Sequence, residues 1–235
     1  MHFTLYALDG IWGPNPIKVA FFLEQLGLEY EVKTLEMNST DKEKGVKGED
    51  YLKICPNGRT PTLIDHKNND FTVWESSAIL QYLGRKYDPS GQYVGNTIEE
   101  QAVVDQWLFF QCTGHSPVQG NLHFSKMYWQ GKYHEEAPEN VVSRFRDETN
   151  RVLGVYEAQL KKQTEKFGES KAWLVFDHPT VADFSAMPWL GSLAKFGDKL
   201  GIDLTQYPHV FTYVKMYLAL PSVTKVLEKL NLAYL

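Results

Sequence analysis

The feature that most constrains the fold of this 235-residue chain is a change in its hydrophobic pattern near Asp88. Before Asp88, short runs typical of strands lie between helical segments, whereas after it only apolar spacings typical of helices occur. The breaker sequence Asp-Pro-Ser-Gly at 88–91 separates the two parts. We therefore expect an α/β domain over residues 1–88 and an all-helical domain over residues 96–235.

The first part contains four strand-like runs, which cover residues 3–8, Tyr30–Leu35, Thr62–Asp65 and Phe71–Trp74. The polar turn His66–Asp70 between the last two runs predicts a hairpin. The spacing of apolar residues over Ser76–Tyr87 predicts a helix. Strand, helix, strand, hairpin and helix form an α/β plan.

The first helix of this plan has clear end signals. Asn15 is a preferred N-cap residue, Pro16 suits the first helical position, and Gly27 suits a left-handed terminator. The apolar stripe between them consists of Val19, Phe22, Leu23 and Leu26. We therefore predict a helix over Pro16–Leu26 with one buried face.

Helical signals dominate the second part of the chain. One helix face is marked by Val103, Trp107 and Phe110, and a long helix is expected to begin near Asn140. Thr180–Asp183 has the form of a capping box with Asp in place of Glu. The segment Gly114–Tyr133, rich in aromatics, is compatible with either a bent helix or an ordered loop.

Composition excludes several classes of protein. The net charge is −5, and the 24 Lys and Arg residues are scattered along the chain, so we expect no nucleic-acid partner. No leader and no apolar run of the roughly 18 to 20 residues that a membrane span needs are evident, so a cytoplasmic protein without a membrane partner is expected. Nucleotide-binding, hydrolase and metal-ligand motifs are absent, and we expect no metal. The two cysteines, Cys55 and Cys112, do not suggest a disulfide framework.

Three short motifs of the first part occur in a distinctive order. They are Gly13–Pro16, Asn57–Leu63 with the sequence NGRTPTL, and Glu75–Ile79 with the sequence ESSAI. In this order and at these spacings they resemble the glutathione transferase superfamily, which implies a thioredoxin-like N-terminal domain followed by an all-α C-terminal domain.

The second part carries the resemblance further. The runs WLFFQ at 107–111, GHSP at 114–117 and HF at 123–124 are similar to fungal glutathione transferases related to the nitrogen-catabolite regulator that forms a prion. That regulator has an Asn/Gln-rich extension, whereas this sequence begins directly at the expected first strand. A prion-forming role is therefore not expected.

The resemblance implies a set of glutathione-binding residues. Glu75 would pair with the γ-glutamyl ammonium, and Ser76 would donate to the γ-glutamyl carboxylate, although Ser76 has the alternative role of a helix cap. Thr60 would precede a cis bond to Pro61 and pair its backbone with the cysteinyl part. Arg59 would reach the glycyl carboxylate, and a surface arginine in a turn is the alternative.

The thiol of glutathione needs a group that stabilises its anion. Asn15 stands at the expected helix N-terminus and is the candidate that the resemblance favours, while a cap without catalysis is its alternative. Tyr6 is a poorer candidate because it lies inside the first strand. Cys55 and Cys112 are interpreted as structural thiols, which leaves glutathione itself as the nucleophile. The family's usual Gln or His is missing near Val46, where a lysine is the available substitute.

The second substrate is expected to contact the helical domain. The candidate lining residues are Phe110, His115, Phe124 and Trp129, with Tyr128 beside them, and ordinary helical core is the alternative for each. The resemblance implies a homodimer that uses glutathione as co-substrate, either for conjugation to electrophiles or for thiol-disulfide exchange as a reductase or deglutathionylase. A non-catalytic ligand-binding or regulatory protein on the same fold is the alternative function.

Overall fold

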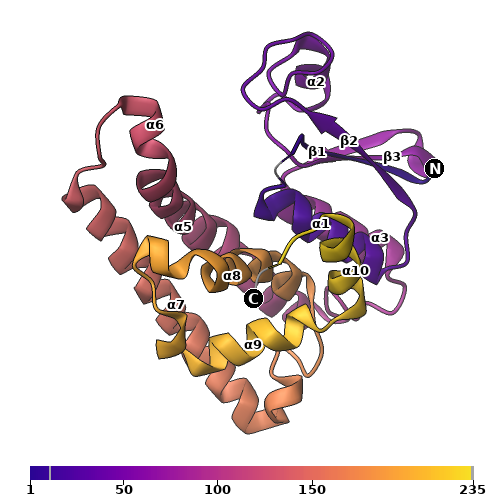
Figure 1. Cartoon of the computed structure of the whole chain (residues 1–235). Helices are drawn as coiled ribbons and strands as arrows, with labels where there is room; N and C mark the ends of the chain where they lie inside the picture. Colours follow the sequence, from indigo (N-terminus) through magenta and orange to yellow (C-terminus); the bar gives the residue numbers. More distant parts are fainter. Residues whose placement is uncertain (11, 234–235) are drawn as a thin grey trace. The chain divides into compact units, whose positions relative to one another are not determined.

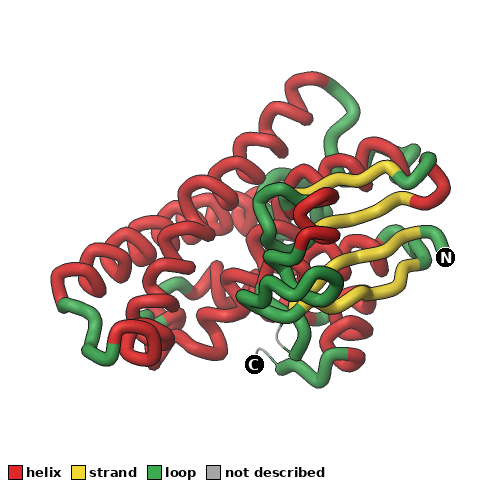
Figure 2. The backbone as a smooth tube through the Cα atoms, turned by 90° about the horizontal axis from the view of Figure 1, so that it is seen from above, coloured by secondary structure: helices red, strands yellow, loops and turns green. Residues whose placement is uncertain are grey.

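The computed structural model describes residues 1–10 and 12–233, which form two compact units. The first unit comprises Met1–Asn96 together with Leu220–Leu232, and the second consists mainly of Thr97–Ala219. The first is an α/β unit and the second is helical throughout its described residues, as the sequence pattern predicts (Figures 1 and 2). No helix among the described residues has the length and apolarity needed to cross a bilayer.

The first unit is built on a four-stranded sheet of order β2-β1-β3-β4. Its strands are β1 (Phe3–Leu8), β2 (Tyr30–Leu35), β3 (Thr62–Asp65) and β4 (Phe71–Trp74). Strand β1 pairs with β2 in parallel and with β3 in antiparallel orientation, and β3 and β4 form the predicted hairpin around the short 3-10 turn His66–Asn68. Figure 2 shows the four strands side by side.

Helices cover both faces of this sheet. They are α1 (Pro14–Gln25), α2 (Glu49–Ile54) and α3 (Ser76–Tyr87), while α10 (Pro221–Lys229) packs against α1. Helices α1 and α3 lie on one face, and α2 lies on the other (Figure 1). Because side chains alternate along a strand, Leu5 and Ala7 face away from Tyr6, whose ring packs against Tyr51 of α2 at 5.3 Å between ring centroids.

The first helix begins two residues earlier than predicted. Its N-cap is Gly13 and Pro14 occupies the first turn, so the prediction that Asn15 is the N-cap is wrong. The reason is that Pro14, which needs no N–H partner, suits the first helical position as well as Pro16 does. The C-terminal signal is confirmed, because Gly27 has a φ of 64° and follows the C-cap Leu26.

Helix α10 groups with the first unit rather than with the helical one. Lys225 Nζ lies 2.5 Å from Glu24 of α1, Lys229 Nζ lies 2.7 Å from it, and Ser222 donates to Gln25 over 2.6 Å. Burial of Val226 adds an apolar contribution. The helical domain expected over residues 96–235 therefore corresponds to a compact unit that ends near residue 219.

The helices of the second unit are α4 (Ile98–Phe109), α5 (Ser116–His123), α6 (Trp129–Tyr133), α7 (Glu139–Phe167), α8 (Val181–Leu200) and α9 (Pro208–Leu218). Two π-helical segments, Phe110–His115 and Phe124–Tyr128, join α4 to α5 and α5 to α6, and short 3-10 turns cover Glu169–Lys171 and Leu204–Gln206. The segment Gly114–Tyr133 is thus a helix with π-helical interruptions rather than a loop. Such interruptions are frequent at functional sites.

A buried carboxylate, that of Asp183, lies in the first turn of helix α8. Asp183 accepts hydrogen bonds from the Thr180 backbone N–H at 2.8 Å and the Leu174 N–H at 2.9 Å, and from the Tyr213 hydroxyl at 2.9 Å. Burial raises the pKa of Asp183, and these donors oppose that effect. The capping interaction predicted from Thr180–Asp183 is therefore confirmed.

Candidate functional site

Strand register brings the three sequence motifs to one end of the sheet. Leu8 pairs with Leu35, and Tyr6 pairs with Thr62, which in turn pairs with Trp74. The carboxyl ends of β1, β2 and β4 and the start of β3 therefore meet at the same end. The loops that leave these strand ends carry the Gly-Pro-Asn-Pro, Asn-Gly-Arg-Thr-Pro and Glu-Ser motifs.

A pocket of about 240 Å³ lies at this end of the first unit. It is lined by Leu8, Asn15, Met37, Asn38, Val46, Lys47, Gly58, Arg59 and Thr60. Asn15, Arg59 and Thr60, predicted from separate motifs, thus share one pocket. Two cations and a helix N-terminus face it, so the pocket can accept an anionic group beside its apolar residues.

Glu75 and Ser76 lie at the same sheet end without lining this pocket. They follow the last β4 pair, Thr62 with Trp74, and are therefore beside Pro61, which precedes the same pair in β3. Glu75 is the N-cap of α3 and makes no side-chain cap bond, so the alternative that Ser76 caps the helix is wrong. Ser76 is 7% exposed and is the first residue of α3.

The backbone of Glu75 is strained. Its φ of 70° lies in the left-handed region, which non-glycine residues adopt at a cost of about 1 to 3 kcal/mol. Such residues cluster at ligand sites, where the surrounding structure holds them in place. The conformation leaves the carboxylate exposed beside the N-terminus of α3.

The Thr60–Pro61 peptide bond is cis, as the resemblance implied. Thr60 is half-buried and lines the pocket with its neighbour Arg59, whose side chain is exposed. Thr60 therefore presents backbone groups, and Arg59 a guanidinium, to the same pocket. These are the two kinds of group expected to hold the cysteinyl and glycyl parts of glutathione.

Lys47 provides the second cation of the pocket. Its Nζ donates to the Asn57 carbonyl over 3.0 Å, which fixes the ammonium at the pocket wall. Gly58 leaves room for the Lys47 side chain, because a Cβ at residue 58 would lie 2.9 Å from Lys47 Cδ, and the φ of Gly58 is 57°. Lys47, the lysine that the sequence offers near Val46, therefore lines the pocket.

Asn15 lies in the first turn of α1 and lines the pocket. Its neighbours Pro14 and Pro16 have no backbone N–H, so among residues 14–16 only Asn15 can offer one. Both its amide side chain and its backbone N–H therefore belong to the positive end of the α1 dipole.

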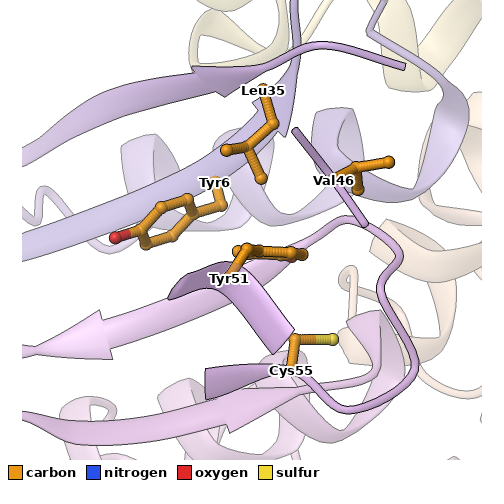
Figure 3. Packing of buried hydrophobic residues seen from close by; sticks show 5 residues of the cluster. All are labelled: Tyr6, Leu35, Val46, Tyr51 and Cys55. Carbon is orange, nitrogen blue, oxygen red and sulfur yellow. The ribbon is translucent and has the colours of Figure 1, made fainter. Parts of the chain in front are cut away.

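Both cysteines have structural surroundings. Cys55 is 1% exposed, and its thiol donates to the Arg59 carbonyl over 3.3 Å. It belongs to a buried cluster with Tyr6, Leu35, Val46 and Tyr51 (Figure 3). Cys112 lies in the first π-helical segment and donates to the carbonyl of Phe109, the last residue of α4, over 3.6 Å. These contacts support the interpretation of both as structural thiols.

The predicted second-substrate residues form two aromatic groups in the helical unit. Phe110 and His115 lie 5.3 and 5.2 Å from the Tyr156 ring, whereas Phe124 and Trp129 lie 6.0 Å from each other, all between ring centroids. His115 is 1% exposed, and its Nδ1 and Nε2 lie 3.1 Å from Tyr156 Oη and 2.7 Å from Gln119 Oε1. His115 is thus part of the helical core, and contact of these residues with a second substrate stays a prediction.

Some pocket residues have little or no signal in the sequence. Helix α2 was missed because it is only six residues long, although acidic Glu49 and Asp50 at its start and Lys53 at its end are typical helix signals. Met37 and Asn38 line the pocket from the loop after β2, and nothing in their sequence indicates this.

Among the described residues, no group of three His, Cys, Asp or Glu side chains could hold a metal ion.

Comparison with known proteins defines the class. Residues 1–85 match the N-terminal domain of glutathione S-transferase, and residues 110–221 match its C-terminal domain. The chain is 37% identical to Glutathione S-transferase 2 of Schizosaccharomyces pombe, over 97% of this chain and 96% of that protein. This chain therefore belongs to the glutathione S-transferase family.

Within the family, the chain belongs to the fungal class related to Ure2p. It is 40% identical to the glutathione transferase URE2P6 from Phanerochaete chrysosporium, solved in complex with oxidized glutathione, with 98% and 96% of the two chains covered and a TM-score of 0.82. It is 31% identical to the nitrogen regulation fragment of the yeast prion protein Ure2p, with 97% and 96% covered and a TM-score of 0.82. The predicted fold and the predicted resemblance are both confirmed.

Proposed function

We propose that this protein binds glutathione at the described end of the sheet and activates its thiol for attack on an electrophile or a disulfide. The observation that carries the proposal is the pocket that Asn15, Lys47, Arg59 and Thr60 share. The similarity to a glutathione transferase solved with oxidized glutathione supports the same ligand class.

Each part of glutathione has a complementary group at this end of the sheet. The γ-glutamyl ammonium pairs with Glu75, and the γ-glutamyl carboxylate accepts from Ser76 at the α3 N-terminus. The cysteinyl backbone pairs with Thr60. The glycyl carboxylate interacts with Lys47 and Arg59, which share the pocket wall with Thr60.

Activation of the thiol requires a lower pKa. A free thiol with a pKa of about 8.5 is only about 3% ionised at pH 7, and a fall of about two units would make it roughly three quarters thiolate. That fall corresponds to about 2.7 kcal/mol. A hydrogen bond to the charged sulfur contributes about 1.5 to 3 kcal/mol, and a helix N-terminus contributes about 0.3 to 1 kcal/mol. Asn15 in the first turn of α1 supplies both contributions.

Two reactions follow from an activated thiolate. In conjugation, the sulfur forms a bond to an electrophilic carbon, and a leaving group departs with the displaced electron pair or a proton adds to the product. In exchange, the sulfur attacks a disulfide and one half leaves as a thiolate. A second glutathione then attacks the mixed disulfide, so that oxidized glutathione and two reduced thiols result.

The decisive test is a titration of bound glutathione that follows thiolate absorbance against pH. We expect a bound-thiol pKa of about 6 to 7 in the wild type and an increase of about one unit in Asn15→Ala. That variant keeps the backbone N–H, so the change measures the side-chain amide alone. Asn121→Ala in the helical unit, where the amide donates to the Pro117 carbonyl, is the matched control. An unchanged pKa in Asn15→Ala would remove the assignment of the amide to the thiolate.

A non-catalytic regulatory protein is the second candidate function. The similarity to the nitrogen regulation fragment of a yeast prion protein favours it. The two functions require the same glutathione contacts and differ only in the state of the thiol. Tight glutathione binding with a thiol pKa near the free value of about 8.5 would support the regulatory function over the enzymatic one.

The assembly we propose is a homodimer. Phe71 and Trp74 of the edge strand β4 are 45% and 38% exposed, and aromatic residues are enriched at protein interfaces. Light scattering after gel filtration should give twice the chain mass of 27.0 kDa, and Trp74→Lys should shift it toward the monomer. We also propose a cytoplasmic location, which the two free cysteines, Cys55 and Cys112, support.

A further inference from the structure

Two buried donors from the α2 region converge on one carbonyl beside the pocket. The Tyr51 hydroxyl donates to the Arg59 carbonyl over 2.7 Å, and the Cys55 thiol donates to the same oxygen over 3.3 Å. Tyr51 is 3% exposed, and neither residue lines the pocket. The Arg59 carbonyl thus receives two hydrogen bonds from the protein interior, one for each of its lone pairs.

Tyr51 also holds the start of strand β3. Its hydroxyl lies 2.8 Å from Thr62 Oγ1, and because the tyrosine proton is directed to Arg59, the Thr62 hydroxyl is the donor in this contact. Thr62 is fully buried. The Tyr51 hydroxyl therefore contacts the residues on both sides of Thr60 and Pro61, namely Arg59 and Thr62.

The direction of the Arg59 carbonyl determines the direction of the next amide. The bond between Arg59 and Thr60 is trans, since the cis bond recorded in this segment is the following one. In a trans peptide, the C=O and the N–H point in opposite directions within one plane. With the carbonyl turned inward to Tyr51 and Cys55, the Thr60 N–H is turned away from them, toward the pocket that Thr60 lines.

We propose that Tyr51, assisted by Cys55, is a positioning residue that aims the Thr60 amide at the cysteinyl part of glutathione. This inference rests on the proposed glutathione site. Tyr51 acts through the peptide plane between Arg59 and Thr60 and touches no ligand. A binding surface made of backbone groups is thereby fixed by side chains buried beneath it.

The test compares two tyrosine-to-phenylalanine variants of the intact protein. Tyr51→Phe removes the hydroxyl but keeps the ring that packs on Tyr6. Tyr93→Phe is the matched control, because Tyr93 is 9% exposed, lies in the same unit, and uses its hydroxyl to accept from Gln25 over 2.8 Å. Calorimetric titration with glutathione should give about a tenfold weaker Kd for Tyr51→Phe and a change within about twofold for Tyr93→Phe.

Further readouts separate positioning from a general loss of stability. At saturating glutathione the kcat of Tyr51→Phe should equal that of the wild type, since the contact at α1 is unchanged, so the defect appears in KM. In the ligand-free protein, the Thr60 amide resonance should shift in Tyr51→Phe and stay in place in Tyr93→Phe. Cys55→Ala should weaken binding by about twofold, and Cys55→Ser, which keeps a donor, should restore it.

The outcomes distinguish this inference from the function on which it rests. If the wild type binds glutathione and Tyr51→Phe binds it equally well, the positioning role is overturned and the proposed function stands. Equal losses in Tyr51→Phe and Tyr93→Phe also overturn it, because the loss then reflects stability alone. A wild type that does not bind glutathione overturns both.

Discussion

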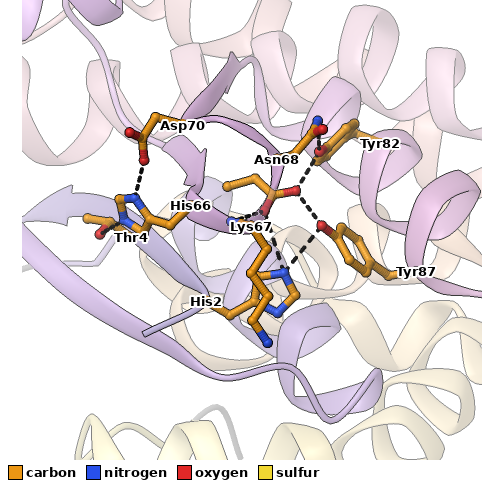
Figure 4. Close-up of polar contacts among 9 residues, drawn as sticks. His2, Thr4, His66, Lys67, Asn68, Asp70, Tyr82 and Tyr87 are labelled. Carbon is orange, nitrogen blue, oxygen red and sulfur yellow. Dashed lines mark hydrogen bonds and ion pairs between the residues drawn. The ribbon is translucent and has the colours of Figure 1, made fainter.

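The two ends of the four-stranded sheet use polar residues in opposite ways. At the end where β1 begins and β3 finishes, Asp65 is fully buried and accepts from Tyr82 over 2.6 Å and from Tyr87. His2 Nε2 lies 3.5 Å from the same carboxylate (Figure 4). At the opposite end, Lys47 and the other polar motif residues line or border a pocket. One end satisfies its polar groups internally, and the other directs them toward a pocket.

This difference separates stability from binding within one small unit. Buried polar groups that are fully hydrogen-bonded fix the local structure, and removal of one partner leaves the others unsatisfied. Polar groups that line a pocket at the surface have less influence on the free energy of unfolding. Substitutions at the Asp65 end should therefore change the free energy of unfolding, and those at the pocket end should change glutathione affinity.

The largest effect is expected at the closed end. Asp65→Asn replaces an acceptor of two tyrosine hydroxyls by an amide, and it should lower the free energy of unfolding by about 3 kcal/mol. Denaturant unfolding followed by circular dichroism measures this loss. Glutathione affinity of the folded variant should stay within about twofold of the wild type. A loss of binding free energy as large as the loss of stability would show that the two ends of the sheet do not act separately on stability and binding.

Ser76→Ala should have the next largest effect, and it should change glutathione affinity rather than the free energy of unfolding. Loss of the hydroxyl should weaken glutathione binding by about 1 to 3 kcal/mol, measured by calorimetric titration. The free energy of unfolding should change by less than about 0.5 kcal/mol, because the N-cap of α3 is Glu75. An unchanged dissociation constant would remove Ser76 from the site.

The strands and the third helix illustrate what the sequence can determine. The ranges Tyr30–Leu35, Thr62–Asp65, Phe71–Trp74 and Ser76–Tyr87 are local patterns of apolar residues and turns, and the structure has the same bounds. By contrast, the start of α1 was misplaced because Pro14 and Pro16 are both suitable at a helix start. The choice between them depends on the loop that joins β1 to α1.

The site was only partly predictable for a similar reason. Thr60, Glu75 and Ser76 belong to recognisable motifs, whereas Met37 lines the pocket and Tyr51 contacts the Arg59 carbonyl behind it without a local pattern that indicates either role. The grouping of α10 with the first unit likewise depends on contacts with Glu24 that lie far away in the sequence. Local periodicity predicts elements, and it does not predict which distant elements pair.

A smaller effect is expected at the cationic wall of the pocket. Lys47→Gln should weaken glutathione binding by about 0.5 to 1 kcal/mol, because the ammonium is solvent-exposed and Arg59 remains. The loss should shrink at high salt, as screening weakens the contribution of an exposed charge. Lys42→Gln, in the same loop and outside the residues that line the pocket, is the control. Equal losses in both variants would assign the effect to net charge rather than to Lys47.

The smallest effect is a pH dependence of stability at the closed end. Burial lowers the pKa of His2 below 6.5, and Lys67 adds to this, while Asp65 opposes it. Because the folded state binds fewer protons than the unfolded state, the His2 contribution is complete above pH 6.5 and is lost as the pH falls below it. Burial opposes the ionisation of Asp65, but the hydrogen bonds from Tyr82 and Tyr87 lower its pKa below the ordinary value of 3.8, so its own contribution is lost only at lower pH.

In denaturant unfolding between pH 5 and 7, His2 should therefore contribute a positive slope of stability with pH, and His2→Gln should remove that contribution. Gln keeps a group able to hydrogen-bond near Asp65 and Tyr87 without titrating. Burial lowers the pKa of His123 in the helical unit as well, so part of the slope should persist in His2→Gln. The bound-thiol pKa should be the same in both proteins, because the thiol lies at the opposite end of the sheet. A slope that His2→Gln leaves intact would assign the acid sensitivity to groups other than His2, and a shifted thiol pKa would show that the two ends are coupled.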